Sequence, residues 1–571
     1  MSGSRVRWAV LIAALSLAYT AAMFRGLEGH SGYSGCAWQA IYPNSFPGDP
    51  FMPPDRPVML SLYYTIVRAV GPLWLDDRFT FFLFAGFSAV ALLAVDKTVR
   101  VMGAAGRLER AALMAFVLLE HRLLVYHPLL IDNYGFSGTW LGGIVGLWLI
   151  LGVLAGWGPA RQIPLIALAF SISMKNTWVP LSLSSVLLWR DRLGAAIRRW
   201  TLGGALAVIA AALTYYYGHL RLMSGTDVQL FDYILTRIDQ SEANPFLNPL
   251  WSNLLFAAFC GLAFLLNGFP AGVLNRIHLV AAGGLLLWVG SGLYLTYAPD
   301  LLKIPYLVPF DPRRALRWPS VVLFLAFGLF LLKRIQQAAS SRAAWTAWVA
   351  LMVLYLAHEQ MRWKLLVVIV AVAAWVLLRH RTLSAAALGP AGRLRLAALP
   401  LVIGTLMLYT VGAVHERGGA LALLARTGIL GDNCTAKWVG VNEYIREHTL
   451  AAATVLAMSL EDTDRRPAPL QFDATLRSRT GRTMPMAHRA NFYLDYAKLQ
   501  WWEERSRLMN DLVAAWDRED LPAVLRGLGR FGPPDYLVIP TVKSGWAEGA
   551  AGLGYRVENR IGDFTLFRRN G

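Results

Sequence analysis

Long apolar segments separated by short polar loops fill the chain from its start to about residue 414. A helix needs about 20 apolar residues to cross the hydrocarbon core of a bilayer. After His415 the long apolar runs stop and ordinary amphipathic patterns begin. The pattern therefore predicts a membrane domain over 1–414 and a domain of another kind over 415–571. Predicted transmembrane helices span roughly 7–24, 79–95, 111–127, 136–156, 200–217, 251–267, 277–297, 319–333, 343–358, 363–379 and 396–414.

Two further segments of the first domain have a mixed pattern. The segment 58–74 carries Arg68 in its middle and lies between Pro57 and Pro72, which favours a helix lying along the membrane surface. The segment 163–189 is interrupted by Met174-Lys175-Asn176-Thr177 and by Pro180. It predicts either one long crossing or two half-length helices that meet at Lys175.

The basic loops decide between these alternatives, because cytoplasmic loops of membrane proteins carry an excess of lysine and arginine. With Arg5 and Arg7 in the cytoplasm, a hairpin over 163–189 keeps every later basic cluster on the same side as the N-terminus. One crossing would move the clusters that follow it outside. The hairpin is favoured, and the predicted fold class is an α-helical polytopic membrane protein of about 13 segments. The basic clusters are 97–110, 190–199, Arg276, 333–342 and 379–395.

The same topology assigns the larger polar loops and the C-terminal domain to the outer side of the plasma membrane. The outer loops are 25–57, 127–135, 218–250 and 298–318. In the C-terminal domain, periodicity predicts a small α/β fold. Its predicted elements are helices at Lys437–His448, Arg505–Trp516 and Leu521–Leu528, strands at Ala453–Leu460 and Tyr536–Ile539, and a hairpin over Tyr555–Arg568.

The composition agrees with a membrane protein. Hydrophobic residues make up 56% of the chain and charged residues 16%, whereas soluble proteins carry roughly 25% charged residues. The formal net charge is +18, but most of the excess lies in the short loops where the positive-inside rule expects it. We therefore expect no nucleic-acid partner.

Asp49 is the first candidate for chemistry. It lies in Phe-Pro-Gly-Asp-Pro-Phe, within the proline-rich first outer loop. Aspartate between proline and glycine is typical of turns, since its side chain bonds nearby backbone. A carboxylate held between prolines in an apolar loop is also oriented and partly desolvated, as a general base acting on a hydroxyl must be. Both interpretations stay open on the residues alone.

Asp132 is the second candidate, in the outer loop His127-Pro-Leu-Leu-Ile-Asp132-Asn-Tyr. It either caps the helix that begins near Phe136 or acts in the chemistry, and the two roles are compatible. His127 is a candidate for substrate binding in the same loop. Upstream, Glu120-His121-Arg122 puts three ionisable groups in a predicted span. Such groups indicate either function or an ion pair that holds helices together.

The basic candidates are Lys175 and three arginines, Arg313, Arg314 and Arg317. A buried ammonium at the hairpin apex needs an anionic partner. The arginines precede a predicted span on the side where the positive-inside rule disfavours them. Guanidinium groups pair with phosphate in two-pronged geometry, so a lipid phosphate is a natural ligand. Lipid anchoring or pairing with Asp311 is the alternative.

No nucleotide-binding fingerprint and no His-Glu-x-x-His zinc motif occurs in the sequence. We therefore predict no nucleotide cofactor and no metal ligands, and leave a divalent cation requirement open. The three cysteines exclude a cysteine-rich metal site. Cys36 and Cys434 both fall on the outer side, where a disulfide between them is permitted.

Taken together, these features resemble the GT-C superfamily of multi-pass membrane glycosyltransferases, in particular its bacterial members. The resemblance lies in the layout of residues 1–420: a first span, a long outer loop bearing Asp49, the surface helix 58–74, the acid Asp132, the hairpin at Lys175 and an arginine-bearing outer loop. Tail phrases such as Glu443-Tyr-Ile-Arg-Glu-His-Thr449 are also similar to the outer domains of bacterial members.

The resemblance implies transfer of a sugar from a polyprenyl-phosphate donor to an envelope glycan, lipid or protein at the outer membrane surface. In that family an acid of the first outer loop acts as the base or orients the acceptor, and here that acid would be Asp49. Many members carry adjacent acids, whereas this loop offers one well-placed acid, with Asp55 and Glu28 less well placed. Two alternatives are a transporter or lipid-handling protein, and an inactive accessory scaffold.

Overall fold

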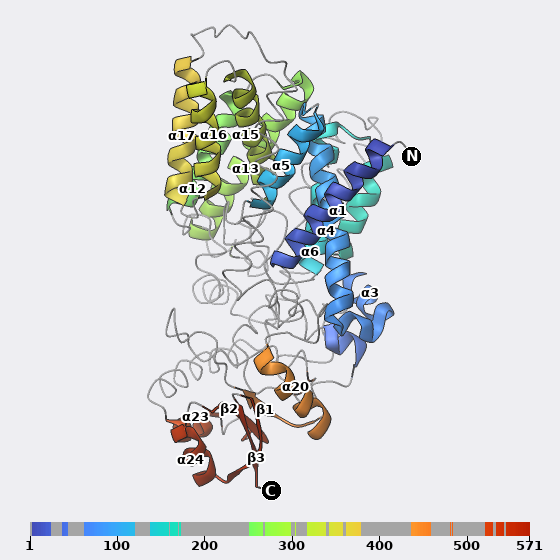
Figure 1. Ribbon diagram of the computed structural model, residues 1–571, viewed down its shortest axis with the longest axis vertical. Helices are drawn as coiled ribbons and strands as arrows, with labels where there is room; N and C mark the ends of the chain where they lie inside the picture. Colours follow the sequence, from blue (N-terminus) through green and yellow to red (C-terminus); the bar gives the residue numbers. More distant parts are fainter. Residues whose placement is uncertain are drawn as a thin grey trace. The chain divides into compact units, whose positions relative to one another are not determined.

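The protein is described by a computed structural model, shown as a ribbon in Figure 1. The chain divides into two compact units. The first comprises residues 1–23, 84–133 and 138–416, and the second 24–83, 134–137 and 417–571. The structure describes residues 3–23, 37–43, 62–104, 106–119, 138–158, 160–169, 250–265, 269–297, 317–338, 342–357, 361–378, 436–450, 452–457, 520–528, 533–541, 544–562 and 564–570, together with positions 171, 172, 303, 480 and 482.

The first unit consists of apolar helices, because its long runs of leucine, valine, alanine and phenylalanine contain few charges. Nine predicted spans are confirmed as helices, in whole or in their described part. Three of them, Arg78–Val101, Ala271–Tyr297 and Trp318–Gln337, are long and apolar enough to cross a membrane, which supports a membrane location. The helices are α1 (Gly3–Met23), α4 (Asp77–Val101, which belongs to this unit from Phe84 on), α5 (Arg107–Leu119), α6 (Gly138–Ala155), α12 (Leu250–Leu265), α13 (Ala271–Tyr297), α15 (Arg317–Gln337), α16 (Arg342–Ala357) and α17 (Met361–Leu378).

Helix α15 is the centre of this unit. It packs against α5, α6, α12, α13 and α16, and nearly all of its apolar stretch is buried. An aromatic cluster fills the space around its middle. Phe324 stacks on Phe116 of α5 with the ring centroids 4.4 Å apart, and Tyr355 of α16 lies 5.8 Å from the Phe324 ring. Rigid aromatic rings of this size fix helix spacing more firmly than flexible side chains do.

The segment predicted as a surface helix forms two shorter elements of the second unit, α3 (Leu62–Val70) and the 3-10 turn η3 (Gly71–Leu75). The break falls at Gly71, whose φ of 67° lies in the left-handed region, and Pro72 follows it. Tyr63 and Trp74 are buried and meet edge to face, with centroids 5.6 Å apart. Helical structure is therefore confirmed over the described part of this segment, with a break that the glycine and proline explain. Its position along the membrane surface stays a prediction.

The C-terminal part of the second unit contains a four-stranded sheet in the order β1-β2-β4-β3. Strand β1 (Val455–Ala457) pairs parallel with β2 (Tyr536–Pro540), which pairs antiparallel with β4 (Phe564–Arg569), and β4 with β3 (Tyr555–Ile561). Gly562, with a φ of 57°, makes the tight turn between β3 and β4. The predicted strand at 536–539 and the predicted hairpin are confirmed.

Helices cover this sheet. Two of them, α20 (Ala436–His448) and α23 (Leu521–Leu528), confirm predicted helices, whereas α24 (Ser544–Gly552) was not predicted. Ile445, Leu521 and Trp546, one from each helix, join the apolar core of the sheet. The predicted helix at 505–516 lies outside the described residues.

Arg482 closes the C-terminal end of α20. Its guanidinium donates to the carbonyl oxygens of Arg446 and Thr449, both at 2.8 Å, and to the Thr449 hydroxyl at 2.9 Å. The last carbonyls of a helix lack partners within the helix and carry partial negative charge. A buried cation at this end therefore stabilises α20, and the same burial lowers the pKa of Arg482.

Candidate functional site

Most residues predicted to act in the chemistry lie outside the described residues. These are Asp49, His127, Asp132, Lys175, Arg313 and Arg314, together with Glu120-His121-Arg122 and the cysteines Cys36 and Cys434. Arg317 is described in its backbone and is the first residue of α15. What the described residues show is the packing of two helices, α15 after the arginine loop and α6 after the loop bearing Asp132.

Trp318 fixes the start of α15 directly after the arginine loop. Its side chain is 1% exposed and lies against α6, where Gly146 makes room for the indole. A methyl group added to Gly146 would lie 2.9 Å from the Trp318 ring, and one added to Gly143 would lie 3.7 Å away. Contacts closer than about 3.4 Å are repulsive. The glycine is thus required for this close approach, and it holds the beginning of α15 against the first half of α6.

Pro319 fixes the same point against a third helix. A methyl group added to Gly284 of α13 would lie 2.8 Å from the proline Cβ, so the two backbones approach closely here. Proline is tolerated in the first turn of a helix because the amide that it lacks would have no partner within the helix. Arg317 therefore precedes a rigid junction of α6, α13 and α15.

The start of α6, which follows the loop bearing Asp132, lies close to the same junction. Gly143 comes five residues after Gly138, the first residue of α6, so about 8 Å of helix separates that first residue from the Trp318 contact. Trp140 anchors the start of α6 to α4 by stacking on Phe84 with centroids 4.5 Å apart and rings 6° from parallel. The loops ending at residues 137 and 316 thus lead into neighbouring helix starts.

Basic residues gather at the opposite end of these helices. Arg276, near the start of α13, donates to the carbonyl oxygen of Leu154 near the end of α6 at 2.8 Å. Lys333, near the end of α15, lies 4.9 Å from the ring centroid of Phe269, just before α13 begins. Both residues were predicted on the cytoplasmic side. Their common end agrees with the predicted alternation of helix directions.

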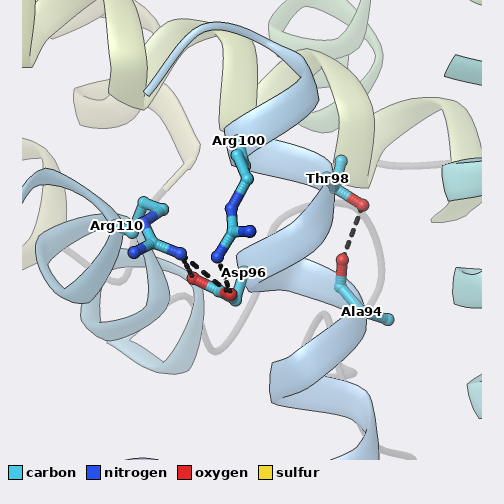
Figure 2. A network of polar contacts seen from close by, with 5 residues as sticks. All are labelled: Ala94, Asp96, Thr98, Arg100 and Arg110. Carbon is cyan, nitrogen blue, oxygen red and sulfur yellow. Dashed lines mark hydrogen bonds and ion pairs between the residues drawn. The ribbon is translucent and has the colours of Figure 1, made fainter. Parts of the chain in front are cut away.

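A buried ion pair at this end joins α4 to α5 (Figure 2). The Arg110 guanidinium donates to both carboxylate oxygens of Asp96, at 2.8 and 3.1 Å. Arg100, one turn after Asp96, approaches the same carboxylate at 3.6 Å, and Arg110 also lies over the Trp8 ring of α1 at 4.7 Å. Asp96 is 3% exposed. The carboxylate therefore ties α4 to α5, and Arg110 extends the contact to α1.

Sequence reasoning missed Asp96, which directly follows the predicted span 79–95 and lies within α4 because this helix continues to Val101. It also missed Lys364, in the first turn of α17. Lys364 is 3% exposed, and its ammonium lies 5.0 Å from the ring centroid of Tyr355. The predicted topology assigns the turn between α16 and α17 to the outer side. A lysine at the second residue of the predicted span 363–379, on the side that the positive-inside rule disfavours, was the signal to notice.

Among the residues that the structure describes, no three histidine, cysteine, aspartate or glutamate side chains gather in a way that could hold a metal ion. Cys260 is the one free cysteine found in that part of the chain, and it is buried in α12. The described part of the chain therefore adds no metal ligand to the candidate residues.

Neither a protein-family model nor a curated protein matches the chain. Among solved structures, the chain is similar to the crystal structure of ArnT from Cupriavidus metallidurans bound to undecaprenyl phosphate. The similarity covers 99% of this chain and 98% of the ArnT chain, with 12% sequence identity and a TM-score of 0.43. At this identity and score, the similarity assigns no role to any residue of this chain.

Proposed function

We propose that the chain is an integral membrane glycosyltransferase that moves a sugar from a polyprenyl-phosphate donor to an acceptor on the outer face of the membrane. The acceptor is a glycan, lipid or protein of the cell envelope. The proposal combines the layout of loops along the sequence with the packing of the helices that follow two of those loops.

The junction of α6, α13 and α15 supports the proposal most directly. The arginine loop and the loop bearing Asp132 lead into helices whose first turns are locked by Trp318, Pro319 and Trp140. Catalysis needs groups held within a fraction of an ångström of the reacting atoms, and side chains carried at the ends of rigid helices meet that demand better than free loops do. The close packing is found in the first turns of α6 and α15, directly after these two loops.

The proposed chemistry is a single displacement at the anomeric carbon of the sugar. The acceptor hydroxyl oxygen forms a bond to that carbon while the bond from the carbon to the phosphate oxygen breaks. Asp49 takes the proton of the hydroxyl, and the polyprenyl phosphate leaves with the electron pair. Attack from the side opposite the leaving group inverts the configuration at this carbon. Asp132 assists Asp49 or binds the sugar.

The cationic residues hold the donor phosphate and stabilise the charge that it gains on leaving. Arg313, Arg314 and Arg317 offer guanidinium groups for this purpose, and Lys175 and His127 complete the set. Stabilising charge that develops in the transition state is commonly the largest contribution to enzymatic rate. Lys364, buried on the same predicted side, is a further cation suited to this role.

Asp49→Asn tests the proposal. Full-length protein in native membranes is supplied with undecaprenyl-phosphate hexoses and pentoses labelled in the sugar, undecaprenyl phosphate being the ligand in the ArnT structure. Transfer of label into the acceptor fraction is expected to fall about a hundredfold or more, since a general base contributes roughly that factor. Asp55→Asn, six residues along in the same loop, is the matched control and is expected to keep its activity.

Two outcomes would contradict the proposal. Near-normal transfer by Asp49→Asn at equal expression would remove Asp49 from the chemistry. Movement of the labelled lipid across the membrane by the parent protein, without any covalent product, would favour the transporter alternative.

A further inference from the structure

One face of the C-terminal sheet carries a row of polar side chains at the end of its strands. Tyr536 of β2 pairs in register with Arg568 of β4, and Arg568 pairs with Arg556 of β3. Residues directly opposite one another in a sheet point to the same face. Tyr536, Arg568 and Arg556 therefore form one row across three strands, and this row is called the arginine row below.

Helix α20 lies over the same face but leaves the corner at Arg556 open. A methyl group added to Gly440 of α20 would lie 3.1 Å from Ile561, which is on the face of the arginine row but at the other end of β3. Further along α20, Tyr444 is within electrostatic reach of Tyr536. Helix α20 thus runs across the sheet from the Ile561 end of β3 toward Tyr536 of β2. Arg556 is exposed, while Tyr536 beneath the helix is buried.

The arginine row has more positive charge than its neighbours balance. Arg568 approaches Glu558 at 3.7 Å and lies 6.0 Å from the Tyr536 ring centroid. The register shift between Val557 and Asn559 brings Glu558 to this face. Within the described part of the chain, Arg556 makes no ion pair or side-chain hydrogen bond. Like charges placed directly opposite in a sheet are destabilising. Glu558 pairs with Arg568, and within the described residues no carboxylate pairs with Arg556.

We propose that Arg556 and Arg568 form a binding site for a phosphate-type anion at this open corner of the sheet. Two neighbouring guanidinium groups match the oxygen atoms of one phosphate, and such charge-assisted hydrogen bonds are the strong ones. The phosphate comes from the headgroup of a membrane lipid or from a phosphorylated sugar. The site stands on the geometry of the sheet and does not depend on sugar transfer by the membrane domain.

The chain supplies matched variants for a test. Arg556→Ala removes one guanidinium from an exposed position, so the sheet is expected to stay folded. Arg560→Ala is the control, because Arg560 is also exposed on β3 but pairs with Thr565 and therefore points to the opposite face. Glu558→Gln removes the competing carboxylate and leaves both arginines available for the anion.

The measurement is calorimetric titration of the purified full-length protein with inorganic phosphate at constant ionic strength. For Arg556→Ala we expect about fivefold weaker binding, near the upper end for an exposed ion pair. For Glu558→Gln we expect about twofold tighter binding, and for Arg560→Ala no change. Phosphate bound elsewhere contributes equally to all variants. The opposite signs at positions 556 and 558 separate loss of a ligand from general damage to the domain.

Equal effects of Arg556→Ala and Arg560→Ala would overturn the proposal, and so would weaker binding by Glu558→Gln. A second titration identifies the source of the anion. Arg556-dependent preference for glycerophosphoglycerol, the deacylated headgroup of phosphatidylglycerol, supports the site as a lipid contact. Arg556-dependent preference for glucose 1-phosphate supports it as a contact to a phosphorylated sugar.

Discussion

Replacing Asp96 with asparagine removes the negative charge that faces Arg110 between α4 and α5. The change keeps the size and shape of the side chain, so packing around it is preserved. The Arg110 side chain is 7% exposed, so solvent reaches little of it and compensates little for the lost negative charge. The variant therefore leaves a buried guanidinium without its counter-charge, while Arg100, whose side chain is 60% exposed, is hydrated in any case.

The expected loss of stability follows from this difference in exposure. Removing one partner of a buried ion pair costs about 3–5 kcal/mol. The asparagine oxygen still accepts one of the two hydrogen bonds that Asp96 accepts, so we expect a value near 3 kcal/mol. The exposed pair of Arg100 with Asp96 is worth at most about 1 kcal/mol. Arg100→Gln is accordingly the matched control, on the same carboxylate.

The assay is reversible unfolding of the full-length protein in mixed dodecyl maltoside and sodium dodecyl sulfate micelles, followed by circular dichroism. A double variant, Asp96→Leu with Arg110→Met, completes the design. Replacing both members of a buried pair by apolar residues of similar volume is often neutral. The double variant is therefore expected to unfold within about 1 kcal/mol of the parent, even though Asp96→Asn alone is strongly destabilised.

Three results would contradict this prediction. If Asp96→Asn unfolds at the same dodecyl sulfate fraction as the parent, the loss of the carboxylate charge does not leave a destabilising charge on Arg110. If the double variant is as unstable as Asp96→Asn, the loss arises from packing around Asp96 and not from the charge left on Arg110. A large effect of Arg100→Gln would show that exposure does not decide the outcome.

Two further predictions concern packing and proton binding. Gly146→Ala is expected to destabilise the folded protein in the same assay by about 1–3 kcal/mol, because the new methyl group meets Trp318. Gly261→Ala in α12 is the control and is expected to stabilise the protein by up to about 1 kcal/mol, because no atom lies within 4 Å of its new methyl group. Equal effects of the two variants would contradict this prediction. Burial raises the pKa of Tyr555 from its ordinary 10.0 to about 12, so the unfolded chain loses this proton at lower pH than the folded domain, and stability falls as pH rises from 10 to 12. Denaturant unfolding across this window is expected to show a shallower fall for Tyr555→Phe, and an unchanged slope would contradict the assignment.

The local pattern of the chain was enough to predict most of its elements. Apolar runs of helical length predicted α6, α12, α13 and α15, because a helix satisfies its backbone groups within itself whatever surrounds it. Alternation around Gly562 predicted the hairpin of β3 and β4. Helix α24 escaped prediction because Gly545, Gly549 and Gly552 give it a weak helical tendency. Its stability comes from burying Trp546 in the core of the sheet, which is a tertiary contact.

The candidate catalytic and binding residues were predicted one by one, and the sequence predicted less about their surroundings than about the elements of the fold. Of the seven residues predicted from the sequence to act on substrates, Arg317 is described, as the first residue of α15, and the other six stay predictions. The sequence showed that arginines precede a span on an unexpected side. It did not show that Trp318 and Pro319 lock the start of that span, since that depends on glycines in two other helices.

By itself, then, the sequence determined the kinds of the elements and their approximate places along the chain, the apolar character of the first domain and the α/β character of the second. These properties depend on neighbours within a few residues along the chain. Tertiary structure alone decided that Asp96 meets Arg110, that Gly146 receives the Trp318 ring and that β1 lies beside β2. These contacts join residues 14, 172 and 81 positions apart. No local pattern contains such partners, because they are selected by the shape and charge of surfaces that exist only after the helices and strands have packed.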